Sequence, residues 1–167
     1  NTKKLKSLKE LYRIGQGPSS SHTMGPRLAA EKYLRRHPDA NAFRVTLYGS
    51  LAATGKGHLT DQAIWEVLGK DRTEFVWHPE ITLPFHPNGM KFEVATPRGS
   101  FTEAWTVFSI GGGALVEEGK VQTETPDVYD LDRLADIKKW CEQRGMSYWE
   151  YVETCEGPEI WDYLQTV

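Results

Sequence analysis

The chain has 167 residues, of which 39% are hydrophobic and 26% charged, and its formal net charge is -3. This length and composition suit a globular domain with its own core, and a charge so close to neutral argues against a nucleic-acid partner. No apolar run approaches the ~20 residues of a membrane span, and no apolar export signal follows the first residues. We therefore expect a cytoplasmic protein without a membrane partner.

The two cysteines, Cys141 and Cys155, do not form a C-x-x-C pair. We therefore expect no metal or cluster site built from this chain alone, and we expect both thiols to be reduced. The alternative, a disulfide between the two cysteines, is not decided by the sequence.

The first predicted helix covers residues 5–14, where leucines recur at helical spacing. Glycine and proline break it at 15–18, and residues 17–26 then read Gly-Pro-Ser-Ser-Ser-His-Thr-Met-Gly-Pro. A second helix is predicted from about residue 23 to residue 36, with Ser21 or Thr23 as its N-cap. His22 is thus expected at a helix N-terminus. Free N–H groups, the helix dipole and hydroxyls there favour a small anion such as a carboxylate or phosphate, although a serine-rich turn that only caps a helix is the alternative.

A second glycine-rich segment, residues 49–61, follows a predicted strand at 43–48 and precedes a helix with Thr60 or Asp61 as its cap. Its Thr-Gly-Lys-Gly stretch resembles half a P-loop but lacks the Ser/Thr that would hold Mg²⁺. The glycines let backbone N–H groups approach an anion, Lys56 adds a charge and His58 a titratable donor. The alternative is a flexible connection, and no ligand spacing supports a metal shared by His22 and His58.

The middle of the chain is predicted to be β structure. Strands at 81–85 and 90–96 flank Asn-Gly as a hairpin, a buried strand covers 102–110 before three glycines, and another strand covers 115–123. Residues 109–113 are either a backbone nest for a ligand or a tight exit from the buried strand. Helices with caps at Asp130 and Ser147, and one opening at Pro158, complete the chain. We therefore predict an α+β fold with a mixed, mostly antiparallel sheet and helices packed on it.

Four segments together, 17–26, 49–61, 86–92 and 109–113, resemble the β domain of bacterial iron–sulfur-dependent L-serine dehydratases. The resemblance implies a fold similar to the allosteric substrate-binding domain of phosphoglycerate dehydrogenases. It also implies a division into a β domain at 1–125 and a helical C-terminal segment at 126–167, directed toward an absent α domain.

That family deaminates L-serine to pyruvate and ammonia through aminoacrylate. It uses a [4Fe-4S] cluster whose cysteines belong to the α part, and this chain has no matching cysteine set. The resemblance therefore implies an L-serine ammonia-lyase β part, with an α domain or subunit as partner and L-serine as substrate. The isolated chain is expected to fold and to be inactive, and a homodimer stays open.

The resemblance also implies roles for residues of the first two segments. His22 is the expected general base or proton shuttle at the serine Cα, and the helix dipole would keep it neutral. The residues expected to bind the substrate's carboxylate or amino group are Ser19, Ser20, Ser21 and Thr23. Those expected to line the same pocket or to brace the loop are Lys56, His58, Thr60 and Asp61.

Two other functions stay open at this point. One is an amino-acid-binding regulatory domain of the same fold without catalytic residues. The other is a protein-interaction domain whose aromatic tail, residues 149–167, forms the interface.

Overall fold

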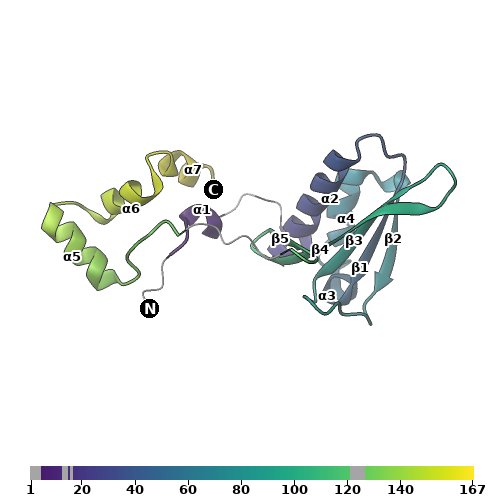
Figure 1. The fold of residues 1–167 in the computed structure, drawn as a ribbon, viewed down its shortest axis with the longest axis horizontal. Coiled ribbons are helices and arrows are strands. Elements are labelled where there is room, and N and C mark those ends of the chain that lie inside the picture. The colour runs from purple at the N-terminus through teal and green to yellow at the C-terminus, as the bar shows by residue number, and fades with distance from the viewer. Residues whose placement is uncertain (1–4, 13–14, 16, 121–126) are drawn as a thin grey trace. The chain divides into compact units, whose positions relative to one another are not determined.

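The computed structural model describes residues 5–12, 15, 17–120 and 127–167 (Figure 1). The chain forms two compact units. We call Gly15–Gln122 the sheet unit, and Asn1–Ile14 together with Thr123–Val167 the helical unit. The predicted division at residue 125, with a segment directed toward an α domain, stays a prediction.

The sheet unit is built on five strands in the order β2-β1-β3-β4-β5. Strands β1 and β2 are parallel, and the other neighbouring pairs are antiparallel. The predicted α+β class with a mixed, mostly antiparallel sheet is thus confirmed. The bounds of the strands are β1 Phe43–Tyr48, β2 Thr73–His78, β3 Gly89–Ala95, β4 Phe101–Gly111 and β5 Ala114–Glu117.

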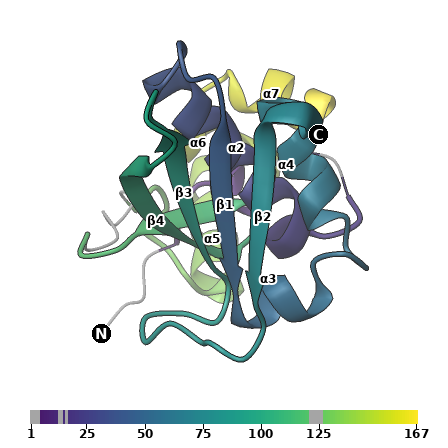
Figure 2. The ribbon, with the colours of Figure 1, turned by 90° about the vertical axis from the view of Figure 1, so that its right-hand side faces the viewer.

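A parallel pair needs a crossover connection, and two helices between β1 and β2 supply it. They are α3 (Gly49–Thr54) and α4 (Thr60–Leu68), followed by a short 3-10 turn at Lys70–Arg72. Helix α2 (Gly25–Arg36) packs beside α4, and both lie on the same face of the sheet (Figure 2).

The core lies between this sheet face and the helices, because alternate strand residues point to one side. It includes Tyr33 of α2, Ile64 of α4 and Phe92 of β3, all fully buried. On β1, Val45 is buried in this core, whereas the preceding Arg44 pairs with Glu74 of β2. This alternation of apolar and charged positions fixes the register of the central strands.

The structure corrects the predicted hairpin in the middle of the chain. Residues 81–85 are not a strand, and β3 pairs instead with β1 and β4. Strand β2, which pairs with β1, was not predicted from the sequence. Ile81 N donates to His78 O in a turn directly after β2, and Pro84 has no N–H with which to join a strand ladder. The strands predicted at 43–48, 90–96 and 102–110 are confirmed.

The helical unit contains α1 (Leu8–Leu11), α5 (Leu134–Arg144), α6 (Tyr148–Glu156) and α7 (Ile160–Thr166). Ser147 caps α6 in a capping box with Glu150, as predicted from the sequence. Asp130 is not a cap, since α5 begins only at Leu134. Helix α1 is much shorter than the predicted 5–14, and residues 13–14 lie outside the described part of the chain.

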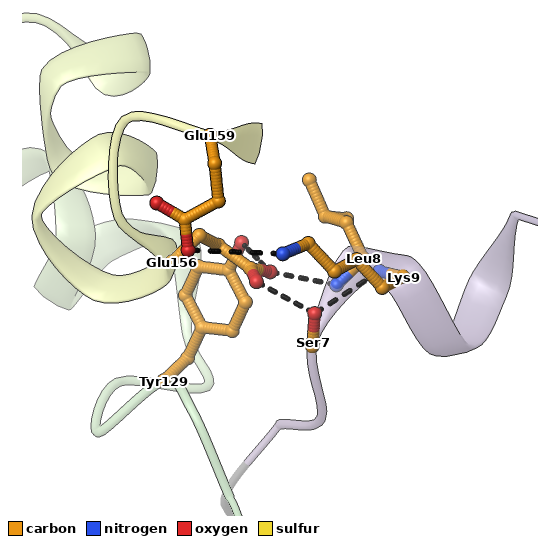
Figure 3. Close-up of polar contacts among 6 residues, drawn as sticks. All are labelled: Ser7, Leu8, Lys9, Tyr129, Glu156 and Glu159. Carbon is orange, nitrogen blue, oxygen red and sulfur yellow. Dashed lines mark hydrogen bonds and ion pairs between the residues drawn. The ribbon is translucent and has the colours of Figure 1, made fainter. Parts of the chain in front are cut away.

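A carboxylate ties the N-terminal residues to α6 within the helical unit (Figure 3). Glu156 accepts hydrogen bonds from Ser7 Oγ at 2.6 Å, from Leu8 N at 2.7 Å and from the Tyr129 hydroxyl at 2.7 Å. Burial alone would raise the pKa of Glu156, but the hydrogen bonds from Ser7, Leu8 and Tyr129 favour the carboxylate and hold this pKa below its usual value.

Within the described residues, no helix combines the length and the apolar character that a membrane crossing needs. Cys141 and Cys155 are both free thiols.

The close approach of Gly25 to Ser109 generates a stability prediction. A Cβ on Gly25 would lie 2.1 Å from Ser109 Oγ and 2.9 Å from Ser109 Cβ. Gly25→Ala should therefore lower the free energy of unfolding by about 1–3 kcal/mol, the usual cost of overpacking, in denaturant titrations.

The matched control is Gly57→Ala, whose added methyl would lie 3.5 Å from the nearest atom, Thr54 O. It should change stability little. In a Ser109→Gly background, where the clashing side chain is gone, most of the cost of Gly25→Ala should disappear. An equal cost in both backgrounds would contradict the packing explanation.

The Glu156 contacts generate a second prediction. Glu156→Gln should weaken the anchoring of the N-terminal residues by about 1–3 kcal/mol, because a charged acceptor of three hydrogen bonds is replaced by a neutral one. Hydrogen exchange at the Leu8 amide measures this loss. The pKa of Glu156 is lowered by folding from 4.5, so its stabilisation should be complete above pH 4.5 and should disappear as the pH falls through the folded-state pKa. This account would be refuted if the Leu8 amide were equally protected from hydrogen exchange in the unaltered chain and in Glu156→Gln, and if that protection did not depend on pH.

Candidate functional site

The serine-rich segment forms a helical turn rather than a loop. Residues Ser20–Met24 make one π-helical turn that runs directly into α2. Ser19 caps this turn: its backbone is extended, with φ -139° and ψ 136°, and its Oγ accepts a hydrogen bond from His22 N at 3.3 Å. The predicted caps Ser21 and Thr23 are therefore wrong, because helical backbone begins earlier than the apolar pattern indicated.

Both ring nitrogens of His22 contact serine hydroxyls. Nδ1 lies 2.8 Å from Ser21 Oγ, and Nε2 lies 3.0 Å from Ser50 Oγ at the start of α3. The sequence reading did not select Ser50 as a site residue. Ser50 lies in the glycine-rich segment 49–61, which the sequence did single out. Helix α3, which directs the Ser50 side chain, was not predicted from the sequence.

Two threonines join the first and second segments reciprocally. Thr23 Oγ1 donates to the His58 carbonyl at 2.7 Å, and Thr60 Oγ1 donates to the His22 carbonyl. Thr23 and Thr60 are 4% and 0% exposed, so water does not compete for these bonds. The bonds bring the two histidine rings to a centroid separation of 5.0 Å.

Hydrogen bonds join the third and fourth segments to each other and to the first two segments. Asn88 and Ser109 are joined twice, through Asn88 Nδ2 to Ser109 O at 3.1 Å and through Ser109 N to Asn88 O at 3.0 Å. Gly112 N donates to Ser20 Oγ at 3.3 Å, and the Pro87 carbonyl accepts from Ser50 N at 3.1 Å. All four sequence segments therefore converge on one serine–histidine turn.

The electrostatics of this turn favour a neutral imidazole. Partial burial is the largest cause that lowers the pKa of His22 below its usual 6.5, and the neighbouring His58 ring lowers it further. An interaction with the Ser50 backbone acts in the opposite direction and is outweighed. A neutral imidazole at neutral pH keeps one nitrogen lone pair, which is what a general base requires.

The remaining predicted site residues differ in how exposed they are. Ser20, Lys56 and His58 are exposed, whereas Ser19 and Ser21 are half-buried. Lys56 Nζ lies 5.4 Å from the centroid of the Trp77 ring. The roles predicted for all of these residues in substrate binding stay predictions.

The predicted cap of α4 is wrong. Leu59, with a left-handed φ of 58°, occupies the N-cap position, and Thr60 is already the first residue of the helix. Its hydroxyl donates to the His22 carbonyl rather than capping the helix. Asp61 Oδ1 accepts from Gln62 N at 2.9 Å within the first turn.

The site opens to solvent. Two cavities of about 630 and 460 Å³ are lined by other residues, the first by apolar side chains of the helical unit and the second by the ends of α2 and β3. Within the described residues, no group of three or more His, Cys, Asp and Glu is placed to hold a metal ion. The turn thus offers hydroxyls, N–H groups and a neutral base on an open surface.

Comparison with known proteins places this chain in a family. The family model described as serine dehydratase beta chain matches residues 7–73 and 66–120. The chain is 44% identical to an L-serine dehydratase of Helicobacter pylori, over 90% of this chain and 43% of that protein. It is 39% identical to one of Mycobacterium bovis, over 67% of this chain and 33% of the relative. It is 30% identical to L-serine dehydratase TdcG of Escherichia coli, over 83% of this chain and 40% of that protein.

The matched part of the chain spans about a third to two fifths of the length of these relatives. The family model, in contrast, covers most of the sheet unit, including all four converging segments. By this match, the chain belongs to the serine dehydratase beta chain family.

Proposed function

We propose that this chain is the β part of an L-serine ammonia-lyase that converts L-serine to pyruvate and ammonia. The observation that carries the proposal is the meeting of the four segments around His22, whose ring lies between the hydroxyls of Ser21 and Ser50. The names of the relatives, all L-serine dehydratases, supply the substrate and the reaction.

In the proposed reaction, His22 accepts the proton from Cα of serine. The electron pair of that C–H bond forms the Cα–Cβ double bond as the C–O bond breaks, and the departing hydroxide takes up the proton released from Cα to form water, which leaves aminoacrylate and a neutral His22. Tautomerisation to the imine and hydrolysis then release pyruvate and ammonia. An imidazole that is neutral at working pH suits the first step, and positioned general bases contribute about 10²- to 10⁴-fold to rate.

The run of Ser19, Ser20 and Ser21 is proposed to bind the carboxylate or the amino group of the substrate. These hydroxyls lie in the first turn of a helix, where N–H groups and the helix dipole favour a negative group. Exposed Lys56 and His58 belong to the second segment, which the threonine bonds hold against this turn. They are proposed to line the same site, and Thr60 and Asp61 to brace it.

The iron–sulfur cluster that the family resemblance implies does not fit the residues of this chain. A [4Fe-4S] cluster is held by about four cysteine thiolates, whereas this chain has only Cys141 and Cys155, in different helices. We therefore propose that the cluster belongs to the α part. The group that assists departure of the hydroxyl would come from there.

The open surface of the site supports a partner over it. Exposed Ser20, Lys56 and His58 leave a bound amino acid accessible to bulk water. Proton abstraction from carbon benefits from excluding water, so the proposed arrangement is a site at the junction of this chain with an α domain or subunit.

The proposal predicts a specific loss of turnover in the enzyme assembled with its α part. His22→Ala should lower kcat at least ~10²-fold, because the proposed base is removed. Pyruvate formation from L-serine is the measurement. His78→Gln is the matched control: His78 lies on β2 and pairs with Glu80, so its rate should match that of the unaltered enzyme.

This chain alone should not turn over serine. Unaltered kcat in the His22→Ala enzyme would remove His22 from the chemistry. If that enzyme instead lost its response to serine concentration, the amino-acid-binding regulatory domain would be favoured.

The pKa of His22 predicts the acid side of the pH profile. Because this pKa lies below 6.5 in the folded chain, the acidic decline of kcat/KM, which follows protonation of the imidazole, should be centred below pH 6.5. Protonation also costs the folded chain more than the unfolded one, so this group should reduce stability below pH 6.5. An acidic decline centred above pH 6.5, or a histidine titration by NMR with a raised pKa for His22, would overturn this assignment.

A further inference from the structure

Main-chain contacts outside the serine-rich turn fix the backbone of Ser50 at the start of α3. Ser50 N donates to the Pro87 carbonyl at 3.1 Å, and the Ser50 carbonyl accepts from Thr54 Oγ1 at 2.8 Å. The preceding Gly49 has φ +49°, and a Cβ on it would lie 2.7 Å from Pro87 O. Backbone packing that only glycine allows therefore sets the start of α3 and the direction of the Ser50 side chain.

The two nitrogens of His22 have different surroundings. Nδ1 faces Ser21, whose Oγ lies 3.5 Å from Ser19 Oγ in the run of hydroxyls proposed to bind the substrate. Nε2 faces Ser50, which belongs to a different segment, 28 residues away in sequence. A neutral imidazole carries one N–H and one lone pair, so the partners of the two nitrogens decide which carries the proton.

Ser50 Oγ lies 3.0 Å from Nε2, so it can accept a hydrogen bond from a proton on that nitrogen. Ser21 can then donate its hydroxyl proton to Nδ1. This arrangement leaves the basic lone pair on the side of the serine run.

We infer that Ser50 is the positioning residue for His22: it accepts the Nε2–H and so fixes the ring as the tautomer whose lone pair on Nδ1 faces the serine run. The inference rests on the proposed function only for the role of that lone pair, which is to accept the Cα proton of the substrate. The contact itself concerns the chain alone and can be tested without substrate or partner.

The test is ¹⁵N NMR of the ¹⁵N-histidine-labelled chain at a pH where His22 is neutral. The chain has five histidines, and His22→Gln identifies the signals of His22 by their loss. The unaltered chain should show His22 predominantly as the Nε2–H tautomer. In Ser50→Ala the ratio of the Nε2–H to the Nδ1–H form should fall about fivefold, the factor that one net hydrogen bond contributes.

Three further variants make the result specific. Ser50→Thr keeps the hydroxyl and should therefore keep the Nε2–H tautomer. Ser50→Cys has a side chain of similar size that is only a weak acceptor, so it should behave like Ser50→Ala. The cysteine variant tests the contact even if the alanine variant disturbs the fold. Ser100→Ala is the control, because it removes an exposed hydroxyl that bonds to Thr96 in a turn between β3 and β4. It should leave the His22 signals unchanged. An unaltered tautomer ratio in both Ser50→Ala and Ser50→Cys would overturn the inference.

Kinetics of the assembled enzyme separate this inference from the proposed function. Ser50→Ala should lower kcat about fivefold with little change in KM, and Ser50→Thr should restore it. If the tautomer shifts in the labelled chain while kcat stays unaltered, Ser50 still positions the ring. In that case His22 is not the base, and the proposed mechanism is refuted.

Discussion

The reciprocal hydrogen bonds of Thr23 and Thr60 are the contacts on which the rest of this site depends. They join the carbonyls of His58 and His22 to hydroxyls 35 and 38 residues away in sequence. Both threonines are buried, so each bond forms where water cannot replace it and where an unpaired carbonyl would be costly. The two segments therefore hold each other in place, and the histidine rings meet as a result.

Small residues let backbone and side chains approach closely around this pair of segments. Gly25 lies against Ser109 of β4, where a Cβ would clash, and Gly49 lies against the Pro87 carbonyl. The buried Asn88 links the two regions through its paired bonds with Ser109. Thus the glycines and the Asn-Gly pair, which are weak signals separately, are explained by one requirement: the start of β3 and the end of β4 must come close to the starts of α2 and α3.

The site combines a helix start with an imidazole that both burial and a neighbouring histidine keep neutral. Such a place favours a negative ligand group next to a base, and the carboxylate of an amino acid meets that description. Several of the same residues are exposed, so the proposed reaction site would have only one of its walls formed by this chain. This division is consistent with a family whose relatives are more than twice as long as the matched region.

The sequence by itself determined the α+β class, the strands at 43–48, 90–96 and 102–110, and the cap at Ser147, because alternation and capping are encoded within a few neighbouring residues. It also marked the four segments and His22. Only the tertiary structure decided the parallel pairing of β1 with β2, the helix start at Ser20 and the place of Ser50 beside Nε2. Those features depend on contacts between residues far apart in the chain. A local sequence pattern therefore cannot predict which hydroxyl the folded sheet and its crossover helix place beside a ring nitrogen.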